Sequence, residues 1–369
     1  MRDNQLSDAL LEWYDRHARV MPWRVAPTAR AAGGRPDPYR IWLSEVMLQQ
    51  TQVVTVLDYF DRFLARFPTI HDLAAAPQEA VMSLWAGLGY YSRARLLHRC
   101  AQAVVGEHGG TFPSTIDALV KLPGIGPSTA AAIASFCYAE PVSIYDGNVK
   151  RVLSRLLAYE GDLTHSADNK QLSDQAQRLL TIGIAQHRLS AANTMPAYTQ
   201  GLMDLGATIC HSRAPLCASC PVRAMCAAHK NGTTERYPIK SKKLKRTTER
   251  WLWLRLETTD AIWLEQRPQT GIWAGMQAPP LFDTEAALSA WLQAIGISAH
   301  RHIAQATGPT IKHVLTHKDL HLTPVTVQLP EPLDVLPSAG REGFWVGKAA
   351  LHEAPLPAPA KKWLIAGGE

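Results

Sequence analysis

The stretch Leu122–Arg151 reads LPGIGPSTAAAIASFCYAEPVSIYDGNVKR and decides the fold of the first half of the chain. In its Leu-Pro-Gly-Ile-Gly segment, Gly124 and Gly126 stand where a tight turn needs positive φ and close backbone approach. Pro127 and Ser128 then begin an alanine-rich run with helical apolar spacing. Exposed amides at the start of such a helix can hold an anion. A DNA phosphate suits this turn, and an ordinary helix–helix connector is the alternative.

An acidic residue opens the next helix. Asp146, within Tyr145-Asp146-Gly147-Asn148, precedes an apolar run that begins at Val149. This position predicts a helix N-cap, and a cap alone stabilises a helix by about 1 kcal/mol. The residues by themselves therefore leave open whether Asp146 is structural or catalytic.

The hairpin turn followed by Asp-Gly-Asn-Val-Lys-Arg resembles the helix-hairpin-helix DNA glycosylases, most closely the MutY-type adenine DNA glycosylases. The resemblance extends from Met21 to about Val346. It implies that Asp146 is ionised and stabilises an oxocarbenium-like sugar, and that Asn148 orients a water molecule or Asp146. It also implies that Gly124, Gly126 and Ser128 contact DNA.

A second carboxylate lies within an apolar helical segment. Glu45 belongs to YRIWLSEVMLQQTQV, residues 39–53, where Trp42, Val46 and Val53 supply a buried face. A carboxyl in such surroundings has its pKa raised and can keep its proton near neutral pH. An ordinary, partly exposed glutamate is the alternative. The resemblance implies that Glu45 protonates adenine and then handles the attacking water.

Further DNA contacts follow from the resemblance. Arg24 closes the segment Met21-Pro22-Trp23-Arg24, and a solvated connector is expected over residues 25–38. Gln50 and Thr51 match the residues that line the lesion. Tyr90 matches a ring inserted beside the damaged base, with Leu88 next to it. Stacking rings near arginines suit unstacked bases, although an isolated aromatic pair more often belongs to a core.

Ser128 separates two kinds of glycosylase. Relatives of the endonuclease III type carry a lysine at the matching place, and its amine forms a Schiff base that leads to strand cleavage. Serine cannot form that adduct, so the sequence predicts a monofunctional enzyme. The alternative role of Ser128 is helix capping.

Four of the six cysteines are clustered. They form the pattern Cys-x6-Cys-x2-Cys-x5-Cys with Cys210, Cys217, Cys220 and Cys226. Four thiolates can bind tetrahedral zinc or a [4Fe-4S] cluster, and a disulfide pair is a third reading. The resemblance favours the [4Fe-4S] cluster. Cys100 and Cys137 stand singly in helical patterns and are expected to be buried thiols.

Composition agrees with a DNA partner. The chain has 369 residues, enough for two domains, and 46% of them are hydrophobic. Its net charge of +6 and pI near 9.0 suit a polyanion. No signal peptide and no apolar run of about 20 residues are present. We therefore expect a soluble, cytoplasmic, nucleoid-associated monomer that does not bind membranes.

The expected fold is a mainly α helix-hairpin-helix domain followed by a small α+β Nudix-like domain. Helical spacing runs from Gln5 to Gly206, and from Trp251 the period changes to two. The predicted divisions are a helical domain over 1–229, a basic linker over 230–250, a Nudix-like domain over 251–350 and a tail over 351–369. The linker is either a solvated tether or a direct DNA contact.

The C-terminal domain resembles the 8-oxoguanine-recognition domain of the same family. It lacks the acidic helix of true Nudix hydrolases, so we expect no pyrophosphatase activity. The family reads the lesion with a Phe-Ser-His turn, and the matching residues are Leu315, Thr316 and His317. Threonine keeps the hydroxyl, whereas leucine cannot stack like phenylalanine. Thr316 and His317 are the candidate contacts, and His317 alone could be an ordinary surface residue.

The sequence thus predicts an adenine DNA glycosylase that acts on double-stranded DNA with A:8-oxoguanine or A:G mispairs. An endonuclease III-like glycosylase/lyase is the second candidate, and Ser128 argues against it. A metal-stabilised DNA-binding module without catalysis is the third. Replacing Glu45 by Gln separates the third from the first, because only an enzyme loses activity.

Overall fold

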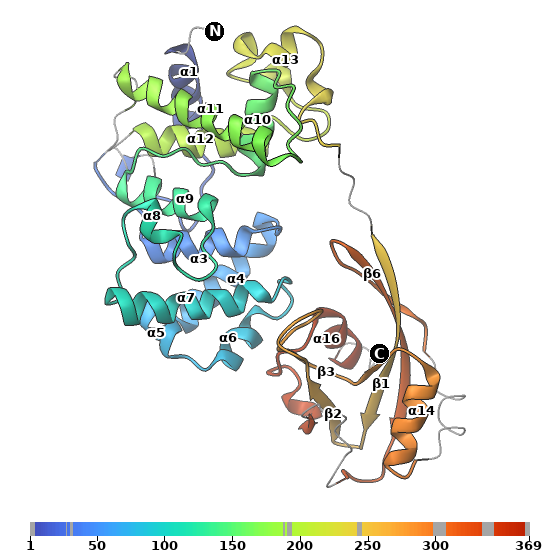
Figure 1. Ribbon diagram of the computed structural model, residues 1–369. Coiled ribbons are helices and arrows are strands. Elements are labelled where there is room, and N and C mark those ends of the chain that lie inside the picture. The colour runs from blue at the N-terminus through green and yellow to red at the C-terminus, as the bar shows by residue number, and fades with distance from the viewer. Residues whose placement is uncertain are drawn as a thin grey trace. The chain divides into compact units, whose positions relative to one another are not determined.

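The computed structural model describes residues 4–26, 28–29, 32–186, 189, 194–241, 246–297, 308–333 and 343–365. The chain forms two compact units, residues 1–75 with 96–243 and residues 76–95 with 244–369. The first unit is helical and the second is built around a β-sheet (Figure 1). The predicted fold class is therefore confirmed, while the predicted boundaries at residues 229, 250 and 350 stay predictions.

Helices make up most of the first unit, joined by short 3-10 turns near the cysteines. Their bounds are α1 (Asn4–His17), α3 (Pro38–Leu48), α4 (Val53–Arg66), α5 (Ile70–Ala75), α7 (Ser92–His108), α8 (Ile116–Leu119), α9 (Pro127–Tyr138), α10 (Gly147–Leu156), α11 (Ser166–Ala185), α12 (Thr194–Thr208), α13 (Ala227–Lys230) and the 3-10 turns η1 (Cys217–Ser219), η2 (Arg223–Met225) and η3 (Thr234–Arg236). Helix α7 begins in the second unit, which also contains α6 (Gln78–Trp85).

Helix α12 is the central support of the first unit. It is buried along most of its length and packs against α1, α9 and α10 (Figure 1). The apolar residues of α10 recur at helical spacing, and Val149, Val152, Leu153 and Leu156 are buried in the same core as Leu202 and Leu205 of α12. Burying these side chains holds the start of α10 close to α12.

A short final stretch of the first unit follows the cysteine segment. Leu163 N donates to Ile239 O at 3.0 Å, so residues after α13 return to the helical core. Part of the predicted basic linker is thus fixed to the first unit. The last residues of that linker, 247–250, belong to strand β1. Lys242, Lys243 and Lys245 lie outside the described residues.

None of the helices in the described ranges combines the length and apolar character that a membrane crossing requires.

The second unit contains a mixed sheet with the described strand order β3-β2-β1-β6-β5, with β4 paired to β1 and β7 to β2. The bounds are β1 (Thr247–Glu257), β2 (Ala261–Gln266), β3 (Gln277–Ala278), β4 (Leu281–Phe282), α14 (Glu285–Ala294), β5 (Ile311–Val314), β6 (Lys318–Gln328), β7 (Gly343–Gly347), the 3-10 turn η4 (Lys348–Ala350) and α16 (Ala358–Ile365). The strands that the period of two from Trp251 predicts are confirmed by β1 and β2.

The parallel pairing of β1 with β6 joins residues far apart in the chain, from Thr247↔Lys318 to Glu257↔Gln328. Antiparallel β5 pairs with β6 at Val314↔Asp319. Leu254, Val325 and Leu288 belong to a core between the sheet and α14. This arrangement brings the start of β1 beside the β5–β6 turn.

Candidate active site and cysteine segment

Glu45 lies on α3, a helix that Asp37 caps by accepting a hydrogen bond from Tyr39 N at 2.9 Å. Most of its neighbours on the helix are buried, and Glu45 itself is partly buried. It lines a cavity of about 400 Å³ together with Arg24, Gln200 and apolar side chains from several helices. A concave, mainly apolar lining with a few polar groups is typical of ligand sites.

Burial, and to a smaller extent the charge of Asp146, raise the pKa of Glu45 to about 7, while the charge of Arg24 acts to lower it. A carboxyl with this pKa is protonated in a large share of molecules at neutral pH. The raised pKa predicted from the sequence is confirmed. A group poised near neutral pH is suited to general acid and base catalysis.

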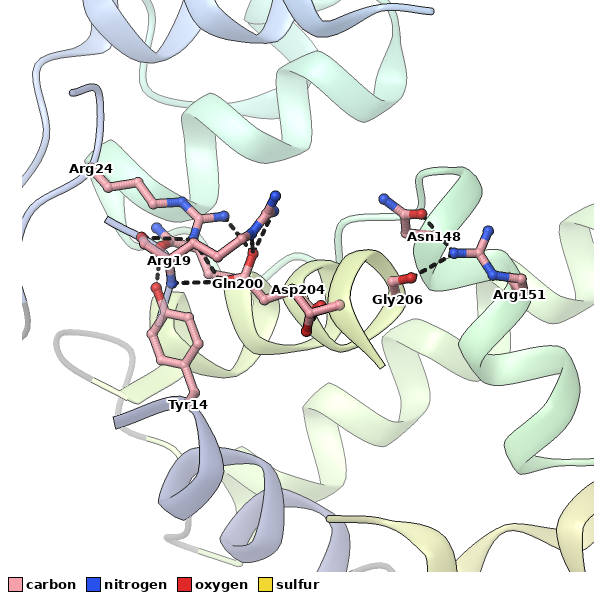
Figure 2. A network of polar contacts seen from close by, with 9 residues as sticks. Tyr14, Arg19, Arg24, Asn148, Arg151, Gln200, Asp204 and Gly206 are labelled. Atoms are coloured by element: carbon pink, nitrogen blue, oxygen red, sulfur yellow. Dashed lines mark hydrogen bonds and ion pairs between the residues drawn. The ribbon is translucent and has the colours of Figure 1, made fainter. Parts of the chain in front are cut away.

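Two arginines at this cavity are held by one carboxylate that the sequence analysis did not single out. Asp204 on α12 is fully buried and accepts both guanidinium groups, as Figure 2 shows. Arg24 binds it with Nη1–Oδ2 at 2.7 Å and Nη2–Oδ1 at 2.9 Å. Arg19 donates from Nε to Oδ1 at 2.7 Å. Such a bidentate contact fixes the direction of Arg24 as well as its position.

Burial acts to raise the pKa of Asp204, but hydrogen bonds and charge from Arg24 and Arg19 outweigh it, and the pKa lies below its ordinary value. Asp204 is therefore an anion that neutralises positive charge at the cavity. The signal that could have found it is the one used for Glu45, a single acid in an apolar helical segment. Beside it, Tyr14 donates to Gln200 Oε1 at 2.5 Å.

Asp146 is the N-cap of α10, as the sequence predicts, and accepts from Val149 N at 2.7 Å. Burial raises its pKa, whereas backbone hydrogen bonds and the charges of Arg151 and Lys150 oppose this. The two carboxylates are thus close enough to influence each other, because Asp146 contributes to the shift of Glu45. Their environments differ, since only Asp146 accepts N–H donors at a helix start.

Asn148 is oriented by Arg151, whose Nη2 donates to Asn148 Oδ1 at 2.8 Å and to Gly206 O at 2.7 Å (Figure 2). Arg151 Nε also donates to Cys210 O at 2.7 Å. A Cβ at Gly206 would lie 2.6 Å from Asn148 Cβ, so glycine permits α10 and α12 to approach here. One guanidinium therefore joins α10, α12 and the cysteine segment.

In the glycine turn before α9, only one of the two glycines has the positive φ that the sequence predicts. Gly124 has φ +75°, and a Cβ there would lie 2.8 Å from Leu96 Cβ. Gly126 has φ −86° and is the N-cap of α9, so the expectation of positive φ at both glycines was wrong. An N-cap residue takes extended backbone, which any residue can adopt. A Cβ at Gly126 would meet no atom within 4 Å. Ser128 is the second residue of α9, and no side-chain cap is formed there.

Other predicted contact residues lie at the ends of elements. Gln50 follows α3 with φ +57° and is exposed, and Thr51 Oγ1 donates to Gln49 O at 3.3 Å. A positive φ is unusual for glutamine and turns the chain between α3 and α4. Arg24 binds Asp204 through its guanidinium group, and its contact with DNA stays a prediction.

In the second unit, Leu88 is buried while Tyr90 is 42% exposed with φ +51°. Thr316 and His317 are exposed in the turn between β5 and β6. Tyr90 Oη and Thr316 Oγ1 form a hydrogen bond of 2.5 Å. The structure therefore joins two of the predicted recognition residues, although they are far apart in sequence.

The four clustered cysteines line one cavity of about 410 Å³ in the first unit. Arg155 contacts two of them, donating from Nη1 to Cys210 Sγ at 3.3 Å and accepting through its carbonyl from Cys226 Sγ at 3.4 Å. Across the described ranges, no three His, Cys, Asp or Glu side chains are arranged to hold a single metal ion. All six cysteines are free thiols, so no disulfide is formed.

The residues present, four cysteine thiols that line one cavity, fit a [4Fe-4S] cluster. Its cysteines bind different irons around the cluster, so the thiolates surround a volume and need not converge on one point. The shared cavity provides such a volume, and Arg155 brings positive charge to it. Cys100 and Cys137 are buried, and burial raises the pKa of each thiol to about 12, as expected for structural cysteines.

Comparison with known proteins agrees with this arrangement. Residues 43–180 match the HhH-GPD superfamily of base excision DNA repair proteins, and residues 250–366 match the NUDIX domain. A structure of a thermostable thymine-DNA glycosylase has a TM-score of 0.52 and 24% identity, covering 62% of this chain and 97% of that one. Fold and site thus define a base excision DNA repair protein of the helix-hairpin-helix class.

Longer matches narrow the class. An adenine DNA glycosylase of Buchnera aphidicola subsp. Schizaphis graminum is 32% identical over 360 residues, 97% of each chain. That of Rattus norvegicus is 44% identical over 225 residues, which are 60% of this chain and 41% of the rat protein. This chain thus spans less than half of the rat relative. It belongs to the adenine DNA glycosylase family.

Proposed function

We propose that the protein excises adenine mispaired with 8-oxoguanine or guanine in double-stranded DNA, by hydrolysing the N-glycosidic bond without cutting the strand. One observation carries the proposal. In a chain of the adenine DNA glycosylase family, Glu45 lines a cavity of about 400 Å³ and has a pKa of about 7, with Asp146 near enough to contribute to that shift.

The target base must leave the helix stack before a side chain can reach its glycosidic bond. We assign the cavity of Glu45 to the extruded adenine. Arg24 and Gln200 line the same wall and present polar atoms to it. Apolar residues such as Trp23 and Phe136 complete the lining and exclude water from the base.

The two carboxylates take different parts, following the logic of glycoside hydrolysis. Glu45 in its protonated form donates its proton to N7 of adenine, which makes the base a better leaving group. Asp146 in its ionised form stabilises the oxocarbenium-like sugar. Asn148, oriented by Arg151, positions Asp146 or the attacking water.

This assignment gives the rate a dependence on pH with two limbs. Excision falls as pH rises through about 7, because Glu45 loses the proton it must donate. It falls again at low pH as Asp146 becomes protonated, at a higher pH than for an ordinary aspartate because burial raises its pKa. Single-turnover rates between pH 4 and 9 give the two limbs.

Two further sites complete the proposal. We assign Cys210, Cys217, Cys220 and Cys226 to a [4Fe-4S] cluster, which when bound supplies a rigid, charged anchor for the segment between α12 and α13. Metal analysis and the visible absorption of the purified chain test the assignment of the cluster.

We assign recognition of 8-oxoguanine to Tyr90, Leu88, Thr316 and His317. We assign further contacts with DNA to Gly124, Gly126, Ser128, Gln50 and Thr51.

The test is single-turnover release of adenine from duplexes with A opposite 8-oxoguanine, G or T. We expect release from the first two, fastest from the first, and neither strand cleavage nor borohydride trapping, because Ser128 has no amine. Glu45→Gln is expected to lose about 10²–10⁴-fold in rate while still binding DNA. If that variant keeps wild-type turnover, the assigned role of Glu45 is wrong.

A further inference from the structure

The turn that carries Thr316 and His317 has a sequence that does not favour a tight turn. Val314 pairs with Asp319, and Leu315 N donates to Lys318 O at 2.8 Å, which leaves two residues to reverse the chain. Two-residue hairpin turns favour glycine or asparagine, because their central residues take positive φ. Here the residues are threonine and histidine, and neither has positive φ. Contacts from outside the hairpin must therefore contribute to its shape.

Those contacts come from the segment that leads into β1. Arg246 Nη2 donates to Leu315 O at 2.8 Å and to Asp319 Oδ1 at 2.5 Å. The next residue, Thr247, donates from its backbone N to His317 O at 3.1 Å. The turn is thus held on both sides of Thr316, once by a side chain and once by the backbone.

Charge balance at the turn supports the same reading. Asp319 accepts Arg246 and also lies 3.7 Å from Lys312 Nζ. Its side chain is 24% exposed, whereas that of Arg246 is 41% exposed. The guanidinium of Arg246 therefore donates two hydrogen bonds at this turn, one to the carbonyl of Leu315 and one to the carboxylate of Asp319.

We propose that Arg246 is a positioning residue that holds the β5–β6 turn, and that it thereby sets how strongly the enzyme prefers 8-oxoguanine over guanine opposite the target adenine. The inference rests on the proposed reading of 8-oxoguanine by Thr316. It assigns one basic residue of the segment before β1 to shaping the recognition turn, whereas a phosphate contact is the alternative use of such a charge.

The experiment compares single-turnover rates on A:8-oxoguanine and A:G duplexes for the full chain and its variants. Arg246→Met keeps the aliphatic stem and removes the donors. Arg250→Met is the matched control, because Arg250 lies four residues further along the chain on β1, is exposed, and its side chain forms no hydrogen bond or ion pair within the described residues. We expect Arg246→Met to lower the ratio of the two rates about fivefold, with the A:G rate unchanged, since a single hydrogen bond contributes about that much. Asp319→Asn should also lower the ratio of the A:8-oxoguanine rate to the A:G rate. Arg250→Met should leave this ratio unchanged.

Three outcomes would overturn the inference. An Arg246→Met ratio equal to that of the wild type removes the positioning role. A loss of affinity for undamaged duplex that is equal in Arg246→Met and Arg250→Met, with a reduced salt dependence, assigns Arg246 to phosphate. A Thr316→Ala/Arg246→Met double variant that loses the sum of both single effects shows that Arg246 does not act through the turn.

Thr316→Ala separates this inference from the function on which it rests. If Thr316→Ala leaves the ratio unchanged, reading by the turn is wrong and both proposals fail. If Thr316→Ala lowers the ratio and Arg246→Met does not, lesion reading by Thr316 survives and only the positioning role of Arg246 is lost.

Discussion

The cavity of Glu45 and the turn of Thr316 are held in opposite ways. At the cavity, Asp204 is fully buried and binds two arginines, one of them in a bidentate contact. At the turn, Asp319 and Arg246 are partly exposed to solvent. Buried charges cost much to leave unpaired, whereas exposed pairs contribute little to stability. The contacts at the cavity thus contribute to the stability of the fold, whereas the turn of Thr316 can change with little effect on folding.

The largest effect is expected at Asp204. Asp204→Asn removes the charge that neutralises Arg24 and Arg19 and leaves the largely buried guanidinium group of Arg24 without its charged partner. We expect a loss of about 3–5 kcal/mol in the free energy of unfolding, measured by urea denaturation. Asp58→Asn, which removes an exposed pair with Arg62, is the control and should cost less than about 1 kcal/mol. Equal losses in the two variants would contradict the contrast.

Replacing Glu45 is expected to change the free energy of unfolding by an intermediate amount, and to raise it where replacing Asp204 lowers it. Its pKa of about 7 lies above the ordinary value of 4.5, so the folded protein binds this proton more tightly than the unfolded chain does. The stability that Glu45 contributes is complete below pH 4.5 and is lost as pH rises through 7. Glu45→Gln cannot ionise and should therefore be more stable than the wild type at pH 8, by on the order of 1–3 kcal/mol, and equal to it at pH 4.5.

Urea denaturation at both pH values measures this difference. Glu79→Gln, on the exposed side of α6, is the control. A variant that abolishes excision and raises stability would mark Glu45 as a residue kept for chemistry at the expense of folding. A Glu45→Gln protein less stable than the wild type at pH 8 would show that burial does not destabilise the ionised carboxylate.

The smallest effect on stability is expected at the turn. Asp319→Asn removes the exposed pair with Arg246 and should change the free energy of unfolding by less than about 1 kcal/mol. Thermal or urea unfolding of the full chain checks this. A loss as large as that of Asp204→Asn would mean that the turn is part of the folding core, and the contrast between the two regions would disappear.

Local pattern was enough to predict much of the fold. Helical spacing predicted the first unit, and alternation from Trp251 predicted the hairpin of β1 and β2. Asp146 was predicted as an N-cap because capping depends on neighbouring backbone groups alone. The pKa of Glu45 followed from its apolar neighbours on one helix. Such features arise within one turn or strand, so adjacent residues reveal them.

Contacts between distant segments were decided only by the tertiary structure. Asp204 lies about 180 residues from Arg24, and nothing near either residue indicates the pairing. The parallel pairing of β1 with β6 likewise joins segments about 70 residues apart and brings Arg246 to Leu315. Gly126 shows the same limit at short range, since its extended φ depends on where α9 begins.

The sequence by itself therefore indicated the candidate residues for the chemistry, because a carboxyl in an apolar helix, an N-cap and four clustered cysteines are local patterns. Only the tertiary structure decided which residues hold them, because a buried ion pair requires two helices to pack before its charges meet. The partners of Asp204 and of Arg246 have no local signature in the sequence. Packing alone places the first between Arg19 and Arg24, and the second beside the turn of Thr316.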